Sequence, residues 1–119
     1  MTIATMVLDA GAELGECPRW HAAERRLYWV DIARCELHRL DPASGRDEVR
    51  RFAVPVGCFA FRKDGGLLLG MKDGFATLAD WDAPPLPFGE QMLAERPDLR
   101  MNDGRTDSRG RFWAGSVNM

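Results

Sequence analysis

A carboxylate between two residues that restrict the backbone is the first feature that could carry chemistry. Glu16 lies between Gly15 and Pro18, directly before an apolar segment that reads as a strand. A tight turn at this point would fix the backbone on both sides, so the Glu16 side chain would point in one direction. A carboxylate held in this way could bind a divalent cation. The same pattern also fits an ordinary surface glutamate in a loop.

The second feature is a polar run near the end of the chain. Arg100, Asn102 and Asp103 lie in the segment RMNDGRTD. Asn-Asp-Gly is typical of a turn, and we expect Asp103 to form that turn. An arginine and an amide both supply directed hydrogen bonds, so beside a metal ion they would suit a polyhydroxylated ligand. Arg100 and Asn102 are therefore candidate substrate-binding residues.

The elements that must position these residues follow a repeat. Three segments each read as an apolar strand, a polar turn and a second apolar strand: Cys17–Asp31, Cys58–Met71 and Gly104–Val117. Their second strands open at Leu27, Leu67 and Phe112, at intervals of 40 and 45 residues. Four-stranded propeller blades repeat at about 40–50 residues, so the period predicts a β-propeller.

The turns and strands agree with this interpretation. Lys63–Gly66 and Ser108–Arg111 are typical of hairpin turns, where glycine supplies a positive φ. The strand segments are nearly continuous apolar runs, which suit a sheet covered on both faces. The best helix candidate, Glu90–Glu95, is short, and Ala83–Gly89 is expected to be a surface loop. The sequence therefore predicts an all-β protein.

The number of repeats also predicts how much of a propeller is present. Residues 1–119 hold roughly two and a half blades, which we expect to be the N-terminal portion of a single, incomplete β-propeller domain. About half or more of the parent protein would then lie beyond Met119. Blade faces left uncovered would favour self-association, because repeat arrays need capping ends.

Composition excludes several classes of protein. Apolar residues make up 45% and charged residues 29%, as in an ordinary soluble globular protein. The formal net charge is −2 and there is no basic cluster, so neither nucleic acid nor an anionic membrane is an expected partner. No apolar run reaches transmembrane length, and the first residues lack the features of a signal peptide. We therefore expect a cytoplasmic protein.

Other residues have structural interpretations. The three cysteines, Cys17, Cys35 and Cys58, fit neither a disulfide framework nor a zinc site and are expected to be small buried or half-buried thiols. Asp31 is expected to cap the turn that follows its strand. The histidines without partners at metal-ligand spacing are His21 and His38. The tryptophans expected in the blade cores are Trp20, Trp29 and Trp113.

The motifs together resemble one family, the SMP-30/gluconolactonase/luciferin-regenerating-enzyme family, which includes regucalcin and bacterial sugar lactonases. The resemblance rests on GECPRW near the start, LYWVDI after it and RMNDGRTDSRGRFWAGSV near the end. It implies a six-bladed β-propeller with one divalent metal ion (Ca, Zn, Mg or Mn) in the central channel. Glu16 matches the metal-binding glutamate of the family, and Arg100 and Asn102 match its substrate contacts. Cys17 departs from the pattern, because glycine or serine is usual there.

The resemblance implies metal-dependent hydrolysis of a sugar lactone to the aldonic acid, by a lactonase acting on carboxylic ester bonds. In the family, the other two metal ligands and a further substrate-binding acid come later, beyond Met119. We expect the general base there too. One alternative is a regucalcin-like protein that binds calcium without catalysis, and another is an inactive propeller fragment. The pair of Arg100 and Asn102 favours the enzyme, since calcium binding does not need a sugar-binding arginine.

Overall fold

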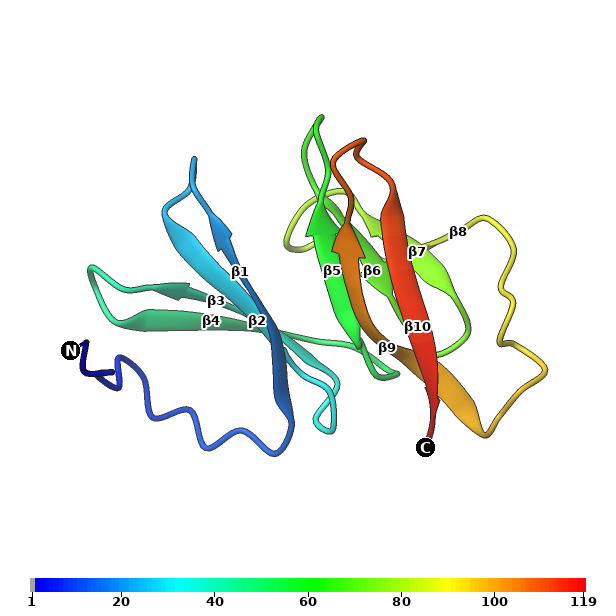
Figure 1. Ribbon diagram of the computed structural model, residues 1–119, viewed down its shortest axis with the longest axis horizontal. Coiled ribbons are helices and arrows are strands. Elements are labelled where there is room, and N and C mark those ends of the chain that lie inside the picture. The colour runs from blue at the N-terminus through cyan, green and yellow to red at the C-terminus, as the bar shows by residue number, and fades with distance from the viewer. Residues whose placement is uncertain (1) are drawn as a thin grey trace.

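The computed structural model describes residues 2–119, and within this range the chain forms ten strands and no helix (Figure 1). The strands of the first sheet are β1 (Gly15–His21), β2 (Arg26–Asp31), β3 (Glu36–Asp41) and β4 (Arg46–Arg51). Those of the second are β5 (Cys58–Phe61), β6 (Leu67–Gly70), β7 (Phe75–Leu78) and β8 (Leu86–Phe88). The third sheet pairs β9 (Leu99–Thr106) with β10 (Phe112–Asn118). All neighbouring strands are antiparallel and follow chain order within their sheet.

The two hairpin turns expected from the sequence are present. The loop between β5 and β6 is closed by a hydrogen bond from Arg62 N–H to Gly66 O at 3.0 Å. The loop between β9 and β10 is closed by Asp107 N–H, which donates to Arg111 O at 2.8 Å. Gly66 and Gly110 have φ angles of 74° and 76°, a region that glycine enters without a steric penalty. The strand-turn-strand repeat is therefore confirmed.

The first two sheets pack face to face through aromatic side chains. The ring of Tyr28 lies edge-on to that of Phe61, with centroids 5.0 Å apart, and 6.1 Å from that of Phe59. Around these rings the buried core continues through aliphatic residues of both sheets, among them Val30, Leu37, Leu69 and Leu78. Burial of this apolar surface fixes the position of the second sheet relative to the first.

The first strands of the three sheets form the inner edge of the molecule. β1, β5 and β9 contact one another. They run in the same direction in Figure 1, with their hairpin turns at one end. This is the arrangement of a propeller, in which each blade directs one edge towards a central channel. Residues at the beginning of β1 and of β9 therefore lie towards the same end of that channel.

Two sequence expectations about the second sheet were wrong. Glu90–Glu95 forms turns and not a helix, because Leu93 N–H donates to Asp73 O at 2.8 Å and is unavailable for a helical bond. The expected loop Ala83–Gly89 contains β8, which pairs with β7 at the outer edge of the sheet. Pro87 is tolerated there because an edge strand has one row of backbone groups without partners.

The expectation that Trp20 and Trp113 lie in blade cores was also wrong. Trp20 and Trp113 are 51% and 63% exposed. Trp20 pairs with Leu27 and therefore shares its face of the sheet, opposite the face that packs on the second sheet through Tyr28. Trp113 instead donates its Nε1 hydrogen to Asp107 at 3.0 Å, in the loop that precedes β10.

No helix in the described part of the chain is long and apolar enough to cross a membrane.

Candidate functional site

Glu16 lies in β1, immediately before a β-bulge. Glu16 pairs with Val30 and Arg19 pairs with Tyr28, so Cys17 and Pro18 together oppose a single residue of β2. Cys17 has a φ of 55°, in the left-handed region. The carboxylate is thus held in a strand, and not in the turn before one that we expected. A bulge bends its strand and changes the direction of nearby side chains, which explains why this feature accompanies Glu16.

The segment that leads into Glu16 is fixed by Asp31. The Asp31 carboxylate is 1% exposed and accepts hydrogen bonds from the N–H groups of Glu13 at 2.9 Å and Leu14 at 3.1 Å. It also accepts from Arg34 N–H at 3.3 Å, which is the turn cap expected from the sequence. Burial by itself would raise the pKa of Asp31, but these donors hold it below its ordinary value. A single buried charge therefore fixes the backbone at the point where the chain enters β1.

The Asn-Asp-Gly segment is not a turn, as the sequence had suggested, but a second β-bulge inside β9. Gly104 pairs with Ala114 and Met101 pairs with Ser116, so Asn102 and Asp103 together oppose Gly115. Arg100 and Asn102 are in direct contact, because Arg100 Nη1 donates to Asn102 Oδ1 at 3.0 Å. The same Nη1 also donates to the carbonyl oxygen of Met101 at 3.0 Å. The two candidate substrate-binding side chains therefore form one unit.

Glu16 and Asn102 occupy the same level of the first and third sheets. Val30, opposite Glu16, and Gly115, opposite Asn102, each lie three residues after the equivalent positions Leu27 and Phe112. Since β1 and β9 are inner strands in contact, the candidate residues of both lie at the same end of the channel. Sequence positions 86 residues apart are thus brought to corresponding places.

The oxygen atoms on these strands could supply part of the ligand set of a hard cation. Glu16 is exposed and makes no ion pair within residues 2–119, so its carboxylate is free to bind a cation. Carboxylate and amide oxygens are ligands that Ca²⁺ and Mg²⁺ accept. The described residues contain no group of three His, Cys, Asp or Glu side chains that could hold a metal by themselves. Glu16 can therefore supply one ligand of a larger set.

An arginine that the sequence did not single out joins the two bulges. Arg19 Nη2 on β1 donates to the carbonyl oxygen of Gly104 on β9 at 3.1 Å. The same guanidinium lies 3.9 Å from the Asp103 carboxylate. Its Nη1 donates to Pro18 O at 2.9 Å. These contacts connect the strand that carries Glu16 to the strand that carries Asn102.

Behind the bulges the inner strands are closely packed around two thiols. Burial raises the pKa of Cys17 and raises that of Cys58 to about 12, so both remain protonated near neutral pH. A Cβ placed on Gly104 would lie 2.9 Å from Cys58 Sγ, and one on Gly70 only 2.6 Å away. The glycine of Asn-Asp-Gly is therefore required for contact between the second and third sheets.

The buried histidine of the first sheet belongs to a separate, structural cluster. His38 Nδ1 lies 2.6 Å from Asp47 Oδ2, and its Nε2 lies 3.0 Å from Glu36 Oε2. The Trp29 ring stacks on the imidazole with centroids 3.8 Å apart. Both ring nitrogens are thus occupied by carboxylates on opposite sides of the ring. This arrangement holds β3 and β4 together and leaves no nitrogen free for a metal.

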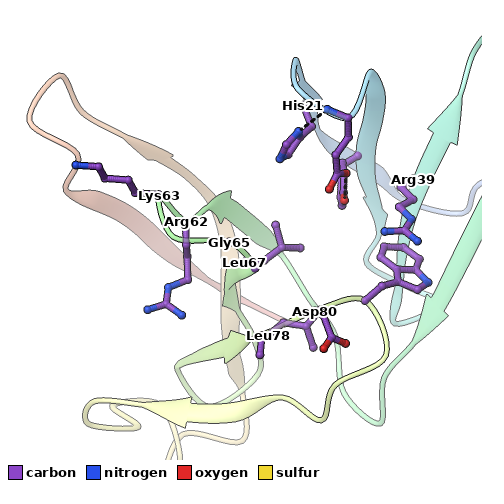
Figure 2. Close-up of a pocket in the computed structure, with 13 residues that line it drawn as sticks. His21, Arg39, Arg62, Lys63, Gly65, Leu67, Leu78 and Asp80 are labelled. Carbon is purple, nitrogen blue, oxygen red and sulfur yellow. Dashed lines mark hydrogen bonds between the residues drawn. The ribbon is translucent and has the colours of Figure 1, made fainter.

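A cavity of about 430 Å³ opens between the first two sheets, at the hairpin end of their strands. Figure 2 shows Arg62 and Lys63 extending away from Arg39 and Asp80, so the charged groups of the cavity do not converge on one point. Arg39 is held by Glu48 at 2.9 Å and stacks on a tryptophan ring. The cavity lies at the opposite end of the strands from Glu16, and its polar groups are largely used in structural contacts.

Comparison with known families matches residues 14–119 to the SMP-30/gluconolactonase/LRE-like region. The chain belongs to this family. A 6-deoxy-6-sulfogluconolactonase from Pseudomonas putida is 44% identical over 108 residues, covering 87% of this chain and 35% of the relative. Regucalcin from Xenopus laevis is 33% identical over 111 residues, covering 93% of this chain and 37% of the relative. The chain thus spans little more than a third of the length of these curated relatives.

A solved structure shows the same architecture. Regucalcin from Agrobacterium tumefaciens, described as a calcium-binding protein, matches with a TM-score of 0.83 at 28% identity. The match covers 90% of this chain and 36% of that protein. It confirms the fold expected from the sequence, an all-β propeller of the SMP-30/gluconolactonase type. The two four-stranded sheets and the third hairpin correspond to two and a half blades.

Proposed function

We propose that the full-length protein containing this chain opens a sugar lactone to its aldonic acid, as a gluconolactonase-type hydrolase that acts on carboxylic ester bonds with a divalent cation. The observation that carries the proposal is that Glu16 and Asn102, each at a β-bulge of an inner strand, lie at one level of the channel. Glu16 directly precedes one bulge and has a free carboxylate, and Asn102 lies in the other bulge and is hydrogen-bonded to Arg100. The lactonase name of a relative 44% identical supports the same reaction class.

In this proposal Glu16 is one oxygen ligand of the cation. A bound divalent cation would polarise the lactone carbonyl and stabilise negative charge on its oxygen. The identity of the cation follows from the complete ligand set, and Ca, Zn, Mg and Mn all accept a carboxylate.

Arg100 and Asn102 bind and orient the sugar. Because Asn102 Oδ1 already accepts from Arg100, the Asn102 amide directs its two N–H donors towards a ligand. Arg100 uses Nη1 for its two contacts and keeps Nη2 for a hydroxyl or ring oxygen. These groups recognise the substrate and do not activate water, so the general base is a different residue. Residues 1–119 alone are therefore expected to be a poor catalyst, since one ligand cannot hold a divalent cation against water.

A second candidate function is calcium binding without catalysis. It is favoured by the relatives named regucalcin, one of which is described as a calcium-binding protein. The contact between Arg100 and Asn102 favours the enzyme, because a calcium-binding protein has no need of a paired arginine and amide beside the cation.

The test is a lactone-opening assay of the full-length protein, followed by proton release, with and without a chelator. We expect hydrolysis that the chelator abolishes and added cation restores. Replacing Arg100 by Gln should raise KM roughly 10- to 100-fold with a smaller change in kcat, as expected for loss of hydrogen bonds to bound sugar. Calcium binding without any lactone opening would overturn the proposal in favour of the second candidate.

A further inference from the structure

A second pair of equivalent residues lies three positions beyond the candidate site on both inner strands. Arg19 follows Glu16 by three residues on β1, and Arg105 follows Asn102 by three residues on β9. Arg19 pairs with Tyr28 and Arg105 pairs with Trp113, and these partners come directly after the equivalent positions Leu27 and Phe112. The two arginines therefore occupy matching positions in the first and third sheets.

The two arginines line one small pocket at the inner edge of the molecule. The pocket has a volume of about 130 Å³ and is bounded by Arg19 from β1, Phe59–Phe61 from β5, and Arg105 and Thr106 from β9. All three inner strands contribute to it. It is large enough for a sulfonate or phosphate group and too small for a whole sugar, since a single water molecule occupies about 30 Å³.

Arg19 is held in place without being saturated. Its two hydrogen bonds go to the backbone oxygens of Pro18 and Gly104, at 2.9 and 3.1 Å. A guanidinium has five N–H donors, so three remain for a ligand. Arg105 is exposed and makes no ion pair within residues 2–119, so its charge is available. Thr106 also lines the pocket.

One carboxylate opposes these two positive charges. Asp103 lies 3.9 Å from Arg19 and is 65% exposed. At that distance and exposure it screens Arg19 weakly, and its Oδ1 is already used by Gly104 N–H at 2.8 Å. Two guanidinium groups against one solvated carboxylate leave the pocket positive. Guanidinium groups and hydroxyls are the donors that bind tetrahedral oxyanions.

The pocket lies at a defined distance from the candidate site. Tyr28 and Val30, the partners of Arg19 and Glu16, are two residues apart on β2, which is about 7 Å along a strand. A six-carbon sugar bound by its carbonyl at the level of Glu16 can span this distance with its far end. We infer that Arg19 and Arg105 form a subsite for a sulfonate or phosphate group on the terminal carbon of the lactone; this inference rests on the proposed function.

The experiment compares three substrates in the full-length protein: gluconolactone, and gluconolactone carrying either a phosphate or a sulfonate on its terminal carbon. Arg105→Gln should lower kcat/KM for the charged lactones roughly 10- to 100-fold, the effect of losing a hydrogen bond to a charged group, and leave gluconolactone unchanged. Asp103→Asn should have the opposite effect and raise kcat/KM for the charged lactones relative to kcat/KM for gluconolactone. Arg109→Gln, at an exposed position in the turn before β10, is the matched control for charge.

The outcomes separate this inference from the proposed function. Equal loss on all three substrates in Arg105→Gln, or no preference for a charged lactone in the unmodified protein, would overturn the subsite while leaving lactone hydrolysis in place. A response to one anion only would identify whether sulfonate or phosphate is recognised. If no lactone is opened, the proposed function fails. Equilibrium binding of the phosphorylated and unsubstituted aldonic acids then tests whether the arginines form an anion subsite. If they do, Arg105→Gln weakens binding of the phosphorylated acid and leaves binding of the unsubstituted acid unchanged.

Discussion

Arg19 Nη2 donates to the backbone oxygen of Gly104 at 3.1 Å, across 85 residues of sequence and from the first sheet to the third. The contact passes along the inner edge, where β1, β5 and β9 meet. It links the bulge that follows Glu16 to the bulge that contains Asn102. Two strands that are remote in sequence are thereby held in a fixed relation before any ligand binds, which is the condition for a preorganised site.

Gly104 provides the most direct test of this packing. A Cβ at Gly104 would lie 2.8 Å from both Phe112 Cζ and Trp113 O, closer than real Cβ contacts allow. We expect Gly104→Ala to lower the free energy of unfolding by about 1–3 kcal/mol, the usual effect of overpacking. Gly115→Ala is the control on the partner strand, because nothing lies within 4 Å of its added Cβ. Urea denaturation of both variants measures the difference, and equal stabilities would show that the sheets are not packed as described.

At the position of Cys17, glycine should stabilise the protein more than alanine, which is the reverse of their usual order in a strand. The φ of 55° at Cys17 disfavours any residue with a Cβ by about 1–2 kcal/mol. Ordinarily alanine is preferred to glycine inside a strand by about 0.5–1 kcal/mol. We therefore expect Cys17→Gly to be more stable than Cys17→Ala, although both lose the buried thiol. Denaturation midpoints of the two variants decide this, and a more stable alanine variant would contradict the left-handed conformation.

The left-handed conformation at Cys17 also explains why glycine would suit this position. Glycine enters the left-handed region without a steric penalty. In this chain the thiol is buried in the core shared with Tyr28 and Phe59. Burial of the side chain offsets part of the conformational cost.

Asp31 should make stability depend on pH in the acid range. Burial opposes its charge, but the N–H donors of Glu13, Leu14 and Arg34 lower its pKa below the ordinary value of 3.8. A folded-state pKa that is lowered stabilises the protein above the unfolded pKa, and this contribution is lost as pH falls through the folded value. Asp31→Asn should lower the free energy of unfolding by about 2–4 kcal/mol near pH 7, because the backbone donors lose a charged acceptor.

The measurement for Asp31 is urea denaturation at a series of pH values. The difference between the unmodified protein and Asp31→Asn should be constant above about pH 4 and should shrink as the pH falls further. Asp64→Asn, at an exposed hairpin position, is the control and should change stability little. A difference that does not vary with pH would show that the Asp31 charge is not what anchors the segment before Glu16.

The sequence predicted the parts of the fold that depend on local pattern. The period between Leu27, Leu67 and Phe112 and the glycines of the hairpin turns are properties of short segments, and the structure agrees with them. The helix candidate at Glu90–Glu95 does not form a helix, because Leu93 N–H bonds to Asp73 O, a partner 20 residues away. Local propensity carries no information on such a contact.

The candidate site was predictable only in the identity of some residues. Asn-Asp-Gly looks like a turn because turns select these residues. Here Gly104 is needed for contact with Cys58 on another sheet, and Asn102 lies in a bulge. Arg19 and Arg105 carried no signal by themselves, because their relation appears only when the first and third sheets are placed side by side. A search for equivalent positions in successive repeats is the one sequence signal that could have paired them.

The measurement that tests the central claim most directly is metal-stimulated lactone opening by Glu16→Gln in the full-length protein. This substitution keeps the size of the side chain and removes the charge that would bind the cation. We expect kcat/KM to fall by at least about 100-fold, more than is typical for residues that only support a metal ligand. Glu95→Gln, exposed in the loop before β9, should retain full activity. Full activity in Glu16→Gln, or hydrolysis that a chelator does not affect, would contradict a metal site built on Glu16.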